Sequence, residues 1–274
     1  MKQKIILLTG LAIVAASFTA CSNDNDRISE DLVTPNVTEL GIPHPFMRME
    51  SYDMEKPDEK TTYNYQYSSD NQVYSFEGNG WTMVIYPFSF SFKNGTSLAN
   101  FKINEKGCAT YFECLRKGIL CEEYHITYDA NNRLSSVKTI DHVLSHTLEK
   151  HYIRKEDGRI DRIVSYADGK AEAQTIYTYG TPATSNKSGI FLTSVSSYDF
   201  LPAMGLLGCP SPCLPKESTY YTESAKNEDI VMHTKYTYKT INTLISQIID
   251  ETEWKDLKWT TIYQYTYKGL YIHE

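Results

Sequence analysis

The chain has 274 residues, and its acidic side chains outnumber the basic ones, so its formal net charge is -7 at pH 7. This balance excludes a typical nucleic-acid binder, because phosphate contacts need clustered lysine and arginine. Tyrosine occurs 22 times, and aromatic residues suit the half-buried surface of a sheet. The composition therefore predicts a β-rich chain with no nucleic-acid partner.

The first predicted element is an export signal. Met1–Lys4 is basic, and the apolar run Ile5–Phe18 is shorter than the ~20 residues that a spanning helix needs. Phe18-Thr19-Ala20-Cys21 resembles the lipobox of bacterial lipoproteins, although an aliphatic residue is usual where Phe18 stands. The resemblance implies a signal peptide over 1–20, lipidation of Cys21, and an outer-membrane lipoprotein that faces the periplasm or the cell surface. A retained transmembrane helix is the alternative.

A polar segment follows the cysteine and predicts a lipidated N-terminus with a flexible tether over 21–47. Ser22–Asp26 resembles the acidic export signal of Bacteroidetes surface lipoproteins, and an ordinary solvated linker is the alternative. We expect the remainder, 48–274, to form one β-rich domain.

Alternating tyrosines then predict strands, as in Tyr63–Tyr67, Tyr124–Tyr128 and Tyr263–Tyr267. Period-two alternation places the tyrosines on one face and the polar residues on the other. The expected fold is a single antiparallel β-meander, an all-β curved or twisted sheet. Its core should contain Tyr65, Tyr128, Tyr179, Tyr238 and Tyr265.

Polar turns separate the predicted strands. Asp129–Arg133 and Glu156–Arg159 are hairpin signals. Tyr128-Asp129 before Arg133-Leu134 resembles a YD repeat. With the lipobox and an insert ending in Leu214-Pro215, the chain resembles an uncharacterised Bacteroidetes lipoprotein family. The resemblance implies a YD-like meander in the cell envelope and adds no activity.

One stretch, near 200–208, is apolar and does not alternate. It predicts a short helix or apolar loop that covers an open end of the sheet, with Leu206 and Leu207 buried. A mobile loop that docks a partner is the competing hypothesis.

Five cysteines remain after Cys21, and an exported compartment permits disulfides. The disulfide candidates are Cys108, Cys114, Cys121, Cys209 and Cys213. Because five is odd, at least one thiol stays outside an internal bridge. We expect either Cys209 or Cys213 to be bonded.

Ligand-type residues are sparse. His142 and His146 are weak metal candidates, and a polar strand face with surface imidazoles is the stronger alternative, so no metal or cofactor is predicted. Trp81, Trp254 and Trp259 are the candidates for ligand contact. The sequence contains no nucleophile elbow, P-loop or dinucleotide fingerprint, and no catalytic residue is predicted.

These observations favour a non-enzymatic envelope lipoprotein that binds a glycan or a partner protein. The alternative is a structural or assembly component of the outer membrane with no small ligand. An unrecognised hydrolase is a third and weaker hypothesis. In each case the membrane is a partner through the N-terminal lipid.

Overall fold

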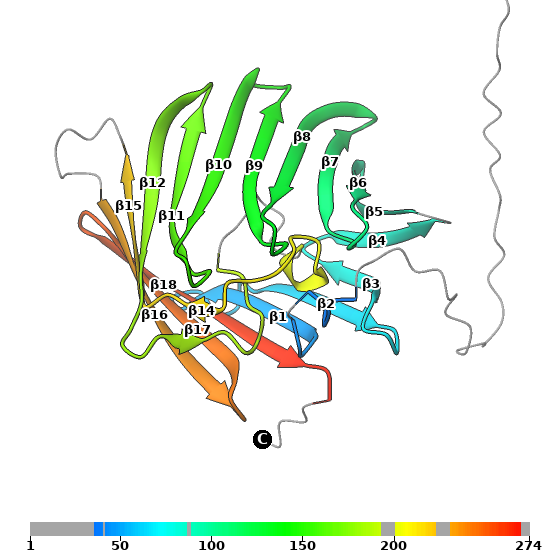
Figure 1. Ribbon diagram of the computed structural model, residues 1–274. Helices are drawn as coiled ribbons and strands as arrows, with labels where there is room; N and C mark the ends of the chain where they lie inside the picture. Colours follow the sequence, from blue (N-terminus) through cyan, green and yellow to red (C-terminus); the bar gives the residue numbers. More distant parts are fainter. Residues whose placement is uncertain (1–35, 41, 87–88, 193–200, 223–230, 270–274) are drawn as a thin grey trace, which may run out of the picture. The chain divides into compact units, whose positions relative to one another are not determined.

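The computed structural model describes residues 36–40, 42–86, 89–192, 201–222 and 231–269. Within these ranges, sixteen antiparallel strands form a closed barrel (Figure 1). The chain closes on itself because β1 (Phe46–Asp53) pairs with both β2 (Thr61–Tyr67) and β18 (Leu257–Tyr267). No helix in these ranges is long and apolar enough to cross a membrane.

The other wall strands follow one another as hairpins, with a single interruption after β12. They are β3 (Val73–Gly78), β4 (Trp81–Tyr86), β5 (Ser89–Asn94), β6 (Ser97–Ile103), β7 (Ala109–Arg116), β8 (Ile119–Tyr128), β9 (Leu134–Asp141), β10 (His146–Arg154), β11 (Ile160–Ala167), β12 (Lys170–Thr178), β15 (Glu217–Thr222), β16 (Val231–Ile241) and β17 (Leu244–Trp254). The prediction of an all-β antiparallel β-meander is confirmed, and the expected curved or twisted sheet is closed into a barrel. Closure leaves no unpaired edge strand in the wall.

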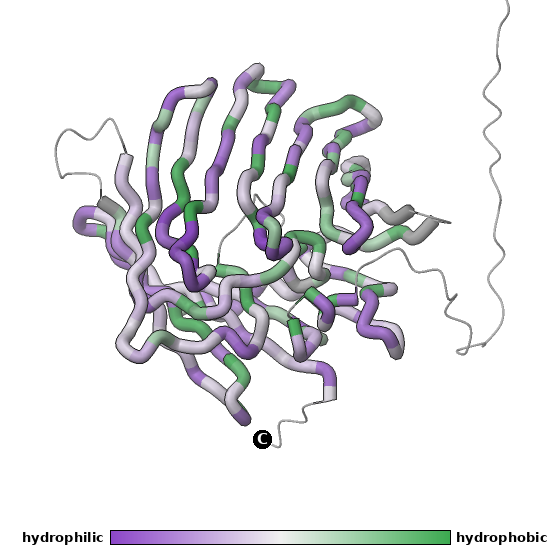
Figure 2. The backbone as a smooth tube through the Cα atoms, viewed as in Figure 1, coloured by the Kyte–Doolittle hydropathy of each residue, from purple (hydrophilic) through white to green (hydrophobic). Residues whose placement is uncertain are grey.

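Alternation along the strands decides which side chains face inward. In β2, Tyr63 and Tyr65 are buried, whereas Asn64 and Gln66 are exposed. In β8, Tyr124 and Ile126 are buried, and His125 between them is exposed. Figure 2 shows the same change between polar and apolar residues along the tall strands of the wall. The apolar core therefore lies inside the barrel.

An aromatic ladder joins five strands of the wall, β3 and β5 to β8. Ring centroids are 5.6 Å apart for Phe76 and Phe92 and 5.3 Å for Phe92 and Phe101. Phe101 and Phe112 stack at 4.8 Å, and Phe112 and Tyr124 at 4.0 Å. Aromatic pairs at these distances add about 0.5–1.5 kcal/mol each beyond the burial of their surface. The ladder thus stabilises the pairing from β5 to β8 and connects β3 with β5 through the interior.

The five tyrosines predicted for the core all lie in it or against it. Tyr65 and Tyr265 are buried. Tyr128, Tyr179 and Tyr238 are partly buried and pack on the same cluster. Their hydroxyls reach carbonyl oxygens, and Tyr128 donates to Leu206 O at 3.0 Å while Tyr238 donates to Pro215 O at 2.5 Å. Tyr128 and Tyr238 therefore combine apolar packing with hydrogen bonds to the insert, whereas Tyr179 donates to Ile160 O of the wall at 2.8 Å.

The YD-like turns share one arrangement. The carboxylate of Asp129 accepts hydrogen bonds from the backbone N–H and Nε of Arg133, both at 2.9 Å. Asp157 accepts the same two bonds from Arg159, at 3.1 and 2.7 Å. Each aspartate therefore ties its turn to the residue that leads into the next strand, as the hairpin signals predicted.

The interruption after β12 contains a segment that we call the cap, residues 186–192 and 201–215. It includes a single 3₁₀ turn, Pro202–Met204, and β14 (Cys213–Leu214), which pairs with β13 (Thr184–Ser185) in a small separate ladder. Leu206 and Leu207 are fully buried. The predicted burial of both leucines is confirmed.

The cap crosses one end of the barrel (yellow and yellow-green in Figure 1). Ala109 N donates to Leu206 O at 2.8 Å, and Ile245 N on the far side donates to Ser188 Oγ at 2.7 Å. Gly208 passes so close to the β8–β9 turn that an added Cβ would lie 2.3 Å from Asn132 O. The insert therefore covers an open end, as predicted, and its leucines complete the interior core.

Part of the predicted tether belongs to the barrel. Val37 and Ile42 are fully buried in the core cluster, and Asn36 bridges to Gln72 in the β2–β3 turn. The burial of these residues was not predicted, because isolated apolar residues among prolines lack the alternation that identified the strands. The predicted signal peptide and Cys21 lie outside the described residues.

Candidate functional site

The barrel has a cleft at the end opposite the cap. Its volume is about 450 Å³. The lining residues come from strand ends beside the β3–β4, β5–β6, β7–β8 and β9–β10 turns: Trp81, Ser97, Cys114, Leu115, Arg116, Cys121, Glu122, Asp141, Val143 and Leu144. Because every second turn of a meander falls at the same end, residues from four distant hairpins meet here.

Two carboxylates face each other in this cleft. Glu122 and Asp141 are direct partners across the β8–β9 ladder. Like charges directly opposite each other destabilise a sheet, so the Glu122–Asp141 pair lowers the stability of the fold. The hydroxyl of Tyr124 donates to Glu122 at 2.8 Å, which offsets part of that cost.

Asp141 also shapes the exposed β9–β10 turn. Backbone N–H groups of Leu144 and Val143 donate to its carboxylate at 2.7 and 2.8 Å. The bond from Leu144 is the main reason that the pKa of Asp141 is lowered. The carboxylate is therefore ionised and orders the turn, whose Val143 and Leu144 side chains are both 69 % exposed.

The cleft combines groups that suit a polar, hydroxyl-rich ligand. Trp81 contributes an indole ring that is half-buried against the core. Arg116 supplies donors, and the carboxylates of Glu122 and Asp141 supply acceptors. Composition alone did not identify Arg116, Glu122 and Asp141 as a group. The signal that could have done so is the alternation of hairpin turns, because every second turn of a meander lies at the same end of the barrel.

The three predicted tryptophans do not form one site. Trp81 lines the cleft, but Trp254 lies at the β17–β18 hairpin tip, where the Lys255 ammonium is 5.3 Å from its ring centroid. Trp259 is half-buried on β18, opposite Thr252. Of the three, Trp81 is the one that lines the cleft together with charged residues.

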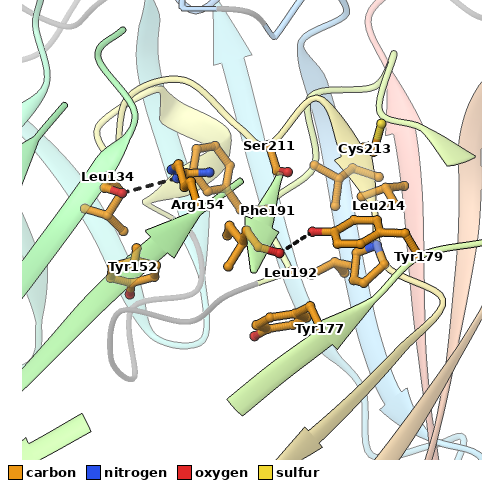
Figure 3. A pocket seen from close by; sticks show the side chains of 13 residues that line it. Leu134, Tyr152, Arg154, Tyr177, Tyr179, Phe191, Leu192, Ser211, Cys213 and Leu214 are labelled. Carbon is orange, nitrogen blue, oxygen red and sulfur yellow. Dashed lines mark hydrogen bonds between the residues drawn. The ribbon is translucent and has the colours of Figure 1, made fainter. Parts of the chain in front are cut away.

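A second cavity lies between the cap and the wall (Figure 3). Its volume is about 20 Å³, which holds one water molecule and no organic ligand. Tyr152 and Arg154 both line it, and the hydroxyl of Tyr152 and Nε of Arg154 are buried without a hydrogen-bond partner among the described residues. We assign this cavity a structural role.

Arg154 connects the wall at this cavity. Its two terminal nitrogens donate to Gly158 O at 3.1 Å and to Leu134 O at 3.2 Å. Burial lowers its pKa, and the nearby charge of Arg133 acts in the same direction. These bonds tie the β10–β11 turn to the start of β9.

The predicted metal candidates lie apart from a ligand set. His142 Nε2 is 3.7 Å from Glu123, and His146 is paired with Asp141 across the β9–β10 ladder. In the described part of the chain, no cluster of three or more histidine, cysteine, aspartate or glutamate residues could hold a metal ion. The closest histidine–carboxylate pair, His151 and Glu149 at 2.8 Å, borders neither cavity.

All five described cysteines are thiols in the structure. Cys114 and Cys121 line the cleft, whereas Cys108, Cys209 and Cys213 lie at the capped end. The choice among the five disulfide candidates therefore stays a prediction.

No protein-family model matches the sequence, and no curated protein matches it. Among solved structures, the fold is similar to a porin-like protein from Bacteroides uniformis ATCC 8492, with a TM-score of 0.64 and 17% identity over 82% of this chain and 98% of that one. A porin-like protein from Bacteroides vulgatus ATCC 8482 is also similar, with a TM-score of 0.59 and 10% identity over 82% and 99% of the two chains. These similarities show a shared porin-like barrel fold.

Proposed function

We propose that this protein is a lipid-anchored structural component of the outer membrane whose barrel stands in water beside the bilayer. The observation that carries the proposal is the distribution of side chains between the two faces of the wall. Apolar residues form the interior core beneath the cap, and exposed polar residues lie along the exterior of the strands.

A barrel that spans a membrane has the opposite arrangement, with an apolar outer band about 25 Å tall and a polar lumen. Here Asn64, Lys138 and Lys235 are exposed near the middle of their strands. A lysine on the lipid face at the bilayer midplane costs about 2–4 kcal/mol. The outer wall is therefore suited to water, despite the porin-like fold.

The interior also argues against a conducting pore. Leu206, Leu207 and Met204 of the cap are fully buried in the same cluster as wall residues such as Phe112 and Ile248. The resulting solid barrel is a rigid body, and attachment to the membrane falls to Cys21. Because residue 36 joins the barrel near the cap, a lipid tether would leave the cleft end free.

Detergent phase partitioning tests the anchor and the wall together. The wild-type protein should enter the detergent-rich phase, and Cys21→Ala should move to the aqueous phase, because the lipid supplies the affinity and the wall does not. Metabolic palmitate labelling should be lost in the same variant. A Cys21→Ala protein that stays in the detergent phase after folding would show that the wall itself contacts lipid.

Glycan binding in the cleft is a second candidate function, favoured by the position of Trp81 beside Arg116, Glu122 and Asp141. A sugar ring could stack on the indole while its hydroxyls bond to the charged groups. A partner protein of the envelope is the other ligand class expected from the sequence.

Binding of cell-envelope oligosaccharides on a glycan array tests this candidate. Trp81→Ala should weaken any binding about tenfold, the effect of losing roughly 1.4 kcal/mol. Trp254→Ala is the matched control, because Trp254 lies outside the cleft. Equal losses in both variants, or no binding by the wild type, would remove the glycan candidate and leave the structural role.

A further inference from the structure

Two cysteines from opposite sides of the contact between cap and wall lie around one asparagine. Cys108 is fully buried in the β6–β7 turn, and the side-chain N–H of Asn132 donates to its sulfur at 3.1 Å. Cys209 follows the buried leucines of the cap, and its backbone N–H donates to Asn132 O at 2.8 Å. The cap therefore reaches the wall at the residue that also holds Cys108.

The two thiols share further contacts. Burial raises the pKa of Cys108, and a hydrogen bond from Asn132 opposes this effect; the same two causes, in the same order, apply to Cys209. The backbone N–H of Gly208 also contacts the sulfur of Cys108. The side-chain amide of Asn132 therefore contacts both sulfurs.

The remaining cysteines occupy other surroundings. Cys213 is close to Arg159 and Tyr179, and Cys114 and Cys121 line the cleft at the far end of β7 and β8. Among the five described thiols, Cys108 and Cys209 are thus the pair placed together by a common partner. One bridge between them also agrees with an odd number of cysteines.

We infer that Cys108 and Cys209 form a disulfide bond in the exported protein and thereby lock the cap covalently to the barrel wall. The inference rests on export to an oxidising compartment, which the proposed function shares. Its geometric part is independent of that function, because it concerns two side chains within one folded chain.

The oxidant is a disulfide, either of a thiol oxidoreductase or of a small molecule. Cys209 is partly exposed, whereas Cys108 is buried, so Cys209 loses its proton and attacks the oxidant first, forming a mixed disulfide and releasing one thiol. The thiolate of Cys108 then attacks the sulfur of Cys209 and releases the second thiol. Two cysteine thiols are oxidised, and one external disulfide is reduced to two thiols.

Peptide mapping by mass spectrometry tests the pairing. The full-length protein, extracted from the envelope in detergent without reductant and alkylated before digestion, should yield a peptide linking Cys108 to Cys209. Cys213→Ser should retain that peptide. Reduction should lower the thermal midpoint of the wild type by roughly 10 °C, as expected for a bridge that closes a long loop, and should leave Cys209→Ser unchanged.

A second arm separates geometry from export. The reduced, folded protein treated with glutathione disulfide should form the same linked peptide. Alkylation of both cysteines in both arms, or a bridge from Cys209 to Cys213, would overturn the inference. If the linked peptide forms only with glutathione disulfide, the two thiols are close enough to bond, but the disulfide does not form in the cell. That result would overturn the inference for the exported protein and would count against export.

Discussion

Replacing Phe112 with alanine should lower the free energy of unfolding by about 3–5 kcal/mol, the usual cost of removing a buried aromatic side chain. Phe112 is fully buried and stacks between Phe101 and Tyr124 in the aromatic ladder. The substitution therefore removes apolar burial and two ring contacts at once, and the rigid wall should leave a cavity that closes only in part.

Tyr111 is the matched control, because it is the preceding residue on β7 and faces outward. Its hydroxyl bonds to Glu113 at 3.2 Å, and Lys102 lies 4.8 Å from its ring centroid. Surface contacts of this kind contribute about 1 kcal/mol or less, so Tyr111→Ala should be mild. Urea unfolding followed by circular dichroism measures both. Equal losses would contradict the assignment of the inner and outer faces.

Replacing Leu207 with alanine should cost about 2–5 kcal/mol. The side chain is fully buried in the interior cluster, although it belongs to the cap and to no strand. A loss of this size would show that the cap is part of the cooperative fold, which is what a solid, non-conducting barrel requires.

Leu257→Ala provides the comparison, since Leu257 at the β17–β18 tip is 58 % exposed. Surface substitutions usually change stability by no more than about 0.5 kcal/mol. The midpoint and slope of urea unfolding should both be recorded. A Leu207→Ala protein as stable as Leu257→Ala would mean that the cap detaches without unfolding the wall, and the alternative of a docking loop would regain support.

Local features of the structure were predictable because they depend on neighbouring residues. Alternating tyrosines place Tyr65 inside and Asn64 outside within one strand, whatever its partners are. The Asp129–Arg133 turn is held by bonds that span four residues. The cap was predictable for a related reason: an apolar run that does not alternate cannot share its faces between core and water.

The candidate site was predicted only in fragments. Trp81 was singled out by residue type, but its neighbours Arg116 and Asp141 come from hairpins far along the chain. The burial of Val37 and Ile42 was missed because a few apolar residues among prolines have no period. His142 and His146 lie four residues apart, yet they belong to no cluster of three or more metal ligands among the described residues.

The sequence by itself determined the β character of the chain, the faces of its strands, its hairpin turns and the buried cap, because each follows from side chains a few residues apart. Only the tertiary structure decided that β1 pairs with β18, that the open end forms a cleft, and that Asn132 contacts both Cys108 and Cys209. Many similar strands could pair with one another, and the choice among them depends on packing between residues far apart in the chain, such as Phe46 and Tyr267, which no local pattern specifies.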